Sequence, residues 1–150
     1  MGINMEINQV LNELLVNLFK DINDIEEKAI HTEEFQGITT NAVHVIEAIG
    51  LGAAKNMSTV AKALHVTMGT LTISVNSLVK KGYVHRIRSE EDRRVVLVSL
   101  TERGRQAHEH HRNFHEQMIH EIVGGLTLQE KEILSSALHK LILFFRKKRT

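Results

Sequence analysis

Cysteine, proline and tryptophan are all absent from this chain of 150 residues. Without cysteine, the chain can form neither a disulfide nor a thiolate metal site, so any zinc site would use nitrogen and oxygen ligands. No apolar run approaches the roughly 20 residues of a membrane-spanning helix. The N-terminal residues also lack the basic and apolar segments of a secretory signal. We therefore expect a cytoplasmic protein with no membrane partner.

The charge balance is nearly neutral, with a formal net charge of +1, while 42% of residues are hydrophobic and 25% are charged. These proportions are typical of a globular protein, and the length fits a single domain. Because the net charge is so small, any binding of nucleic acid would require local basic patches.

Apolar residues recur at steps of three and four near both ends, which predicts long amphipathic helices there. The first stripe consists of Ile7, Leu11, Leu14, Leu18, Ile22 and Ile25. Between these ends, a helix capped by Thr39 or Thr40 is expected to end at Gly50. Thr101 is expected to begin a helix that reaches the Gly124–Gly125 break. Thr127 with Glu130 then forms a capping box for the last helix.

The central region has the pattern of a helix-turn-helix, in which the second helix enters the major groove of DNA. Ser58 is expected to cap the first, short helix, and Thr67 the second, which ends near Gly82. Short polar side chains on the second helix suit base edges and phosphates, although a solvated polar face would look the same. The candidate DNA-binding residues here are Ser58, Thr67, Met68, Gly69, Thr70, Thr72 and Asn76.

An arginine-rich hairpin follows, with strands predicted at 83–88 and 95–100 and a loop at about 89–93. An arginine at a loop tip can enter the minor groove, where the negative potential is strongest. Asp92 could hold the guanidinium of Arg94, or of its neighbour, in a two-pronged hydrogen bond. The alternative is a surface hairpin whose charges only neutralise one another. The candidate residues are Arg86, Arg88, Asp92, Arg93 and Arg94.

The region from Ser58 to Gly104 resembles the winged helix-turn-helix of MarR-type repressors. The most specific stretch is "DRRVVLVSLTERG", in which Asp92 and Arg94 take the wing Asp-x-Arg positions. Within that family, "HVIEAIG", "VTMGTLTISVNSLVKKGYVHRIRS" and "FHEQMI" are similar to the FabT type, which represses fatty-acid synthesis. His65 departs from the turn-favouring residue usual before the second helix.

The resemblance implies a mainly α fold with a small β-hairpin wing, assembled as a MarR-like dimer. It makes residues 1–150 a single domain, with dimerisation helices at about 1–36 and 101–150 and a DNA-binding lobe at about 37–100. The implied partners are a second copy of the chain, a palindromic double-stranded operator and acyl carrier protein bearing long-chain acyl groups.

Two other classes of protein fit the sequence less well. An enzyme is not expected, because the chain has no HExxH motif, nucleophile elbow or phosphate loop. A purely structural dimerisation module would explain the apolar stripes near the two ends. It would explain neither the polar face of the second helix nor the wing.

An acyl effector would need an apolar tunnel with few polar groups. Its candidate lining is Ile22, Ile25, Val43, His44, Ile46, Phe114, His115 and Met118. No cofactor is required by this reading, but zinc is an alternative, because His111 and His115 lie four residues apart on one helical face. His44, Glu47 or Glu26 would then supply a further ligand. These histidines are otherwise hydrogen-bonded groups in an interface or pocket wall.

Overall fold

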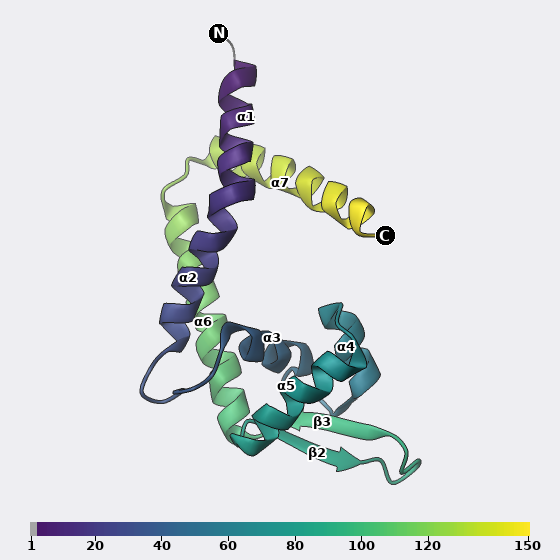
Figure 1. Cartoon of the computed structure of the whole chain (residues 1–150). Coiled ribbons are helices and arrows are strands. Elements are labelled where there is room, and N and C mark those ends of the chain that lie inside the picture. The colour runs from purple at the N-terminus through teal and green to yellow at the C-terminus, as the bar shows by residue number, and fades with distance from the viewer. Residues whose placement is uncertain (1–2) are drawn as a thin grey trace. The chain divides into compact units, whose positions relative to one another are not determined.

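The computed structural model describes residues 3–150, with side chains from residue 6 onward. It divides into two compact units, Met1–His111 and Arg112–Thr150. The elements of the first unit run in this order (Figure 1): α1 Ile3–Glu13, a π-helix η1 Leu14–Leu18, α2 Phe19–Ile30, α3 Thr40–Ile49, β1 Lys55–Asn56, α4 Met57–Leu64, α5 Met68–Lys80, β2 Val84–Arg88 and β3 Val96–Leu100. Helix α6, Glu102–Gly124, begins in the first unit, and α7, Leu128–Arg149, lies in the second.

The long N-terminal helix is interrupted by η1, an interruption that the apolar spacing did not predict. A side-chain hydrogen bond from Asn17 Nδ2 to Glu13 Oε1, at 2.9 Å, spans the junction between α1 and η1. Among the described side chains of this segment, only Glu26 and Ile30, both on α2, are buried. The stripe on α1 and η1 therefore remains accessible to a partner.

Polar caps define the three helices of the helix-turn-helix region. Thr39 caps α3 and Thr67 caps α5, both as predicted. Ser58, however, is not a cap: Asn56 caps α4 by accepting from the backbone N–H of Thr59 at 2.8 Å. The helix begins earlier than predicted because Met57 is buried and becomes its first residue.

The turn between α4 and α5 passes through His65, which has a left-handed backbone with φ +55° and ψ +44°. Among the described residues, it is the one non-glycine residue with a positive φ. A left-handed residue other than glycine costs roughly 1–2 kcal/mol. His65, which departs from the turn-favouring residue usual here, therefore lies at a position where glycine or asparagine would be less strained.

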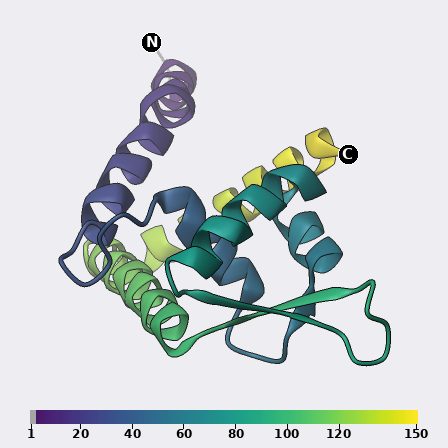
Figure 2. The ribbon, with the colours of Figure 1, turned by 60° about the horizontal axis from the view of Figure 1, so that its bottom comes forward.

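The small sheet has three antiparallel strands in the order β1-β3-β2. Strand β2 pairs with β3 from Val84 opposite Leu100 to Arg88 opposite Val96, and Lys55 of β1 lies opposite Val98. The segment that follows α3 thus contributes a two-residue strand, Lys55–Asn56. The loop between β2 and β3 covers 89–95 and projects beyond the helices (Figure 2).

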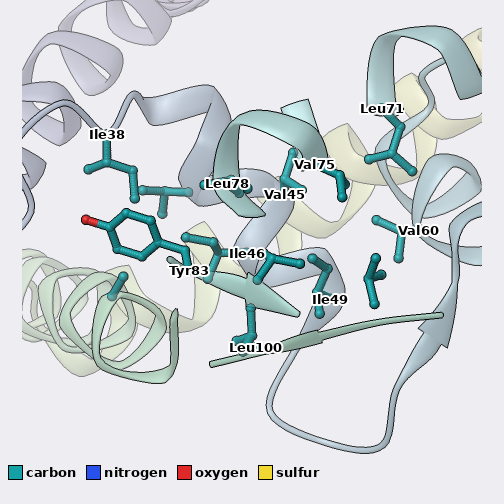
Figure 3. Packing of buried hydrophobic residues seen from close by; sticks show 14 of the residues in the cluster. Ile38, Val45, Ile46, Ile49, Val60, Leu71, Val75, Leu78, Tyr83 and Leu100 are labelled. Atoms are coloured by element: carbon teal, nitrogen blue, oxygen red, sulfur yellow. The ribbon is translucent and has the colours of Figure 1, made fainter. Parts of the chain in front are cut away.

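The core of the first unit lies between helices α3, α4 and α5 and the sheet (Figure 3). Ile46, Val60, Val75, Tyr83 and Val98 are all fully buried in it. The guanidinium of Arg103 lies 4.5 Å from the centre of the Tyr83 ring. The mainly helical fold with a small β wing is thereby confirmed.

The second unit contains the rest of α6 and the whole of α7. The predicted capping box is present: the Thr127 side chain accepts from the backbone of Glu130, and the Glu130 carboxylate accepts from the backbone N–H of Thr127. These hydrogen bonds lower the pKa of Glu130. No residue of α7 is buried within the unit. No helix in the described part of the chain is long and apolar enough to cross a membrane.

Candidate nucleic-acid interface

Helix α5 has one buried face and one exposed face. Leu71, Val75 and Leu78 pack into the core, whereas Thr70, Thr72 and Asn76 are exposed, as the sequence predicted. The exposed face is therefore available to a ligand along the length of the helix.

The hydroxyl groups at the start of α5 are already hydrogen-bonded within the helix. Thr67 Oγ1 accepts from the Thr70 N–H at 3.2 Å and donates to Thr70 Oγ1 at 3.0 Å. Thr72 Oγ1 donates to the Met68 carbonyl at 2.7 Å. A hydroxyl that donates internally still has lone pairs that accept. The hydroxyls of Thr67 and Thr72 thus suit donors on bases better than phosphate oxygens, which can only accept, whereas the Thr70 hydroxyl accepts from Thr67 in this pair and can still donate.

The wing loop carries the expected fork between Asp92 and Arg94. Arg94 Nε donates to Asp92 Oδ1 at 3.1 Å and Arg94 Nη2 donates to Oδ2 at 3.2 Å, while the Arg94 backbone N–H also donates to Oδ1. The Arg94 side chain is nonetheless 91% exposed. The hydrogen bonds from the Arg94 side chain, and then from its backbone, lower the pKa of Asp92. The fork therefore orients an accessible guanidinium.

Two further contacts organise the hairpin, and the sequence did not reveal either. Arg88 Nη1 donates to the Arg93 carbonyl at 2.9 Å across the loop. Arg86 Nη1 on β2 donates to Asn76 Oδ1 on α5. The second contact joins the wing to the exposed face of α5. The contact between Arg86 and Asn76 depends on how β2 packs against α5, and the contact between Arg88 and Arg93 depends on the conformation of the loop.

A concave surface of about 630 Å³ lies between the starts of α4 and α5 and the hairpin. Its polar and charged lining includes Ser58, Thr72, Arg86, Arg88 and Arg94. The three guanidinium groups are the charged side chains of this lining, and guanidinium groups favour anions such as phosphate. This groove brings together candidate DNA-binding residues that are far apart in the sequence; Ser58 and Arg94 are separated by 36 positions.

Three candidate metal ligands lie together in the first unit. One ligand atom each from His44, Glu47 and His111 falls within 4.8 Å of the others, and His111 Nε2 lies 3.1 Å from Glu47 Oε1. The His111 side chain is only 2% exposed. Nitrogen and carboxylate donors of this kind fit zinc. His115 lies one turn later on α6, in the second unit.

The candidate effector residues are divided between the units. Val43 and Ile46 are members of the core, Ile22 is half-buried and Ile25 is exposed. Phe114, His115 and Met118 lie in the second unit. The acyl tunnel remains a prediction.

Comparison with known proteins agrees with this geometry. Residues 28–110 match the family model "Transcriptional regulator SarA/Rot". The SarZ regulator of Staphylococcus haemolyticus is 31% identical over 62% of this chain and 63% of its own length. The HTH-type regulator YpoP of Bacillus subtilis is 26% identical over 70% of this chain and 69% of its own length.

Solved structures extend the likeness over most of the chain. FabT of Streptococcus pneumoniae, crystallised in complex with DNA, is 38% identical with a TM-score of 0.87, covering 93% of this chain and 98% of that one. A mutant MarR of Escherichia coli complexed with operator DNA is 27% identical with a TM-score of 0.63, covering 89% and 96%.

These matches define a winged-helix transcriptional regulator of the MarR type. The chain belongs to the SarA/Rot family of transcriptional regulators.

Proposed function

We propose that this regulator binds a palindromic double-stranded operator as a cytoplasmic homodimer and represses transcription there. The observation that carries the proposal is the fork that presents Arg94 beside the groove at the start of α5. Residues at about 37–100 bind the DNA, and the helices at about 1–36 and 101–150 form the dimer. FabT and MarR, both solved with DNA, support this assignment.

Each half of the dimer would contact DNA in two places. The exposed face of α5 enters the major groove, and Arg94 enters the neighbouring minor groove, where its oriented guanidinium meets the strongest negative potential. Arg86 and Arg88 lie between these two contacts and face the phosphate backbone. Gly69, at the start of α5, allows the backbone of the helix to approach the duplex, and Met68 lines the groove beside it.

The wing contact is tested by Arg94→Ala, with Arg105→Ala as the matched control. Both arginines are exposed, but Arg105 lies on α6, away from the groove. Arg94→Ala should weaken operator binding severalfold. It should also reduce the number of counterions released on binding by about one, which is measured as a shallower slope of log affinity against log salt concentration. Full affinity in Arg94→Ala, measured by fluorescence anisotropy, would exclude the wing assignment.

We further propose that the regulated genes are those of fatty-acid synthesis and that long-chain acyl groups on acyl carrier protein strengthen binding. The support is the similarity to FabT over nearly the whole chain. The acyl chain would lie among the apolar candidates of α2, α3 and α6, with His44 and His115 as polar groups at the mouth. Such an effector helps only if it binds the DNA-competent state better than the other state.

Zinc is the second candidate effector, and the cluster of His44, Glu47 and His111 supports it. These three residues would hold the ion through two imidazole nitrogens and a carboxylate oxygen, and a fourth ligand would complete a tetrahedral site. Bound zinc would connect α3 to α6 and so stabilise one arrangement of the dimer helices.

The two effectors predict different responses in one experiment, which measures operator affinity with and without acylated carrier protein and a chelator. The acyl proposal expects affinity to rise in the presence of chelator, and Phe114→Trp to abolish the rise by filling the tunnel. The zinc proposal expects chelation, or His111→Gln, to abolish binding while acyl groups change nothing. That second result would contradict the fatty-acid assignment.

A further inference from the structure

A large apolar side chain stands on the exposed face of the helix that we assign to the major groove. Ile73 on α5 is 74% exposed. At 3.6 residues per turn it lies roughly 200° around the helix from Leu71, which is fully buried. Ile73 therefore points directly away from the core. Ile73 was not among the candidate DNA-binding residues expected from the sequence.

The neighbours of Ile73 on that face are polar or lack a side chain, and none is longer than Ile73. Gly69 and Thr70 lie one turn before it, and Asn76 and Ser77 lie one turn after it. A Cβ built at Gly69 would meet only Thr67 Oγ1, at 4.0 Å, so the space before Ile73 is open. Ile73 is consequently a highly exposed apolar side chain that no neighbour one turn away covers.

The surroundings of Ile73 are polar and cationic. Arg86 contacts Asn76 on the same face, and Arg88 and Arg94 line the adjoining groove. Isolated exposed apolar residues are common on protein surfaces. Here, however, the residue occupies the middle of a surface whose charge fits DNA, so the same groups that attract the duplex bring Ile73 against the floor of its major groove.

The major groove offers one apolar group that a side chain can contact, the C5-methyl of thymine. We propose that Ile73 is a specificity-determining residue that selects thymine in each half-site by packing against this methyl. The inference rests on the proposed DNA-binding function and names the chemistry of one contact within it.

The same contact discriminates against other bases. Placed over the polar edge of a G·C pair, Ile73 would displace water from donors and acceptors without replacing their hydrogen bonds. As a β-branched residue, Ile73 has few rotamers to lose on binding. The hydrogen bond from Arg86 takes one of the two lone pairs of Asn76 Oδ1, which leaves Asn76 fewer acceptor positions for a base.

The expected effect is small but measurable. Burying one methyl group contributes about a fourfold change in affinity, equivalent to about 0.8 kcal/mol. Uracil lacks the methyl of thymine and otherwise presents the same edge. Replacing the contacted thymine with uracil should therefore weaken binding about fourfold, whereas replacing other thymines should not.

The test combines uracil substitution with side-chain substitution. A duplex enriched from a random pool by the full-length protein is resynthesised with each thymine replaced in turn by uracil, and Kd is measured by fluorescence anisotropy. The wild type should show one sensitive thymine in each half-site. Ile73→Ala should bind the thymine and uracil duplexes equally. Ile119→Ala, which changes another exposed isoleucine, on α6, should retain the sensitivity.

The outcomes separate this inference from the function on which it rests. If the wild type enriches a duplex and no thymine is sensitive, or if Ile73→Ala keeps the sensitivity, Ile73 does not read thymine and DNA binding still stands. If the wild type enriches no duplex, both proposals are wrong. Because Ile73 is exposed, Ile73→Ala should melt at the wild-type temperature, which separates loss of contact from loss of fold.

Discussion

At the scale of single residues, Gly104 determines how closely α6 approaches the backbone of Tyr83, directly before β2. A Cβ added there would lie 2.1 Å from the Tyr83 carbonyl oxygen and 3.2 Å from Leu100 Cβ. The same carbonyl accepts the Thr101 backbone N–H at 3.1 Å. A side chain at this position would therefore displace the helix or break that hydrogen bond.

We expect Gly104→Ala to destabilise the first unit by about 1–3 kcal/mol, the usual cost of overpacking. At this chain length each kcal/mol lowers Tm by about 2–4 °C. Gly52→Ala is the matched control, because a Cβ at Gly52 meets nothing within 4 Å. Equal Tm values for the two variants, measured by circular dichroism, would contradict the close approach.

A second residue-scale prediction concerns the protonation of Asp92. Its pKa is lowered from 3.8 by the side-chain and backbone hydrogen bonds from Arg94. A group with a lowered pKa favours the folded fork above its ordinary pKa, and this contribution is lost as the pH falls through the lowered value. The fork should thus be intact throughout the neutral range.

Carboxyl NMR should place the Asp92 midpoint below 3.8 in the wild type. It should rise toward the ordinary value in Arg94→Ala, which removes the larger cause and leaves the backbone hydrogen bond. An identical midpoint in both proteins would mean that the fork does not persist in solution.

At the scale of elements, local signals predicted much of what the structure contains. The caps at Thr39, Thr67 and Thr127 involve residues at most three positions apart, so their hydrogen bonds follow from sequence order. The cap of α4 was misplaced because Asn56 and Ser58 are both good capping residues. Only the burial of Met57 decides between them.

Features that depend on packing at a distance were not predictable. Strand β1 has two residues and exists because it pairs with β3. The contact between Arg86 and Asn76 joins a strand to a helix. Ile73 is different, since counting the helical angle from the apolar stripe would have found it. The interruption at η1 has no signal in the sequence that we can identify.

The contact between Arg86 and Asn76 leads to a prediction about the coupling of wing and helix. If Arg86 holds Asn76 in its binding orientation, Arg86→Ala and Asn76→Ala should remove a shared interaction. In a double-mutant cycle, the loss of binding free energy in the double mutant should therefore differ from the sum of the two single losses by about 0.5–3 kcal/mol. The pair Arg88→Ala and Asn76→Ala is the control. Additive losses for Arg86 and Asn76 would indicate independent contacts.

At the scale of the whole molecule, the structure leaves apolar side chains near both ends of the chain unburied within their own units. Leu18, Leu138 and Phe145 remain exposed, and no residue of α7 is buried. Apolar surfaces of this extent on a regulator indicate an interface. A two-fold dimer would cover them and place two recognition helices about 34 Å apart, one turn of DNA.

Sedimentation velocity at micromolar concentration should therefore show a dimer for the wild type. Leu138→Glu should shift it toward monomer by placing a charge in the interface, whereas Ile73→Glu, on the DNA-facing surface, should leave the dimer intact. A monomeric wild type would refute the dimer. Dissociation by Ile73→Glu but not by Leu138→Glu would assign the interface to the wrong helices.

We propose that two copies of this chain read DNA sequence with paired winged helices. Selection of duplexes from a random pool by the purified full-length protein tests it most directly. We expect enrichment of a palindrome whose half-site centres lie about 10 base pairs apart, matching the two-fold axis of the protein. Arg94→Ala should enrich the same palindrome less strongly. Retention of DNA without enrichment of any sequence, or enrichment of a single unpaired half-site, would contradict the claim.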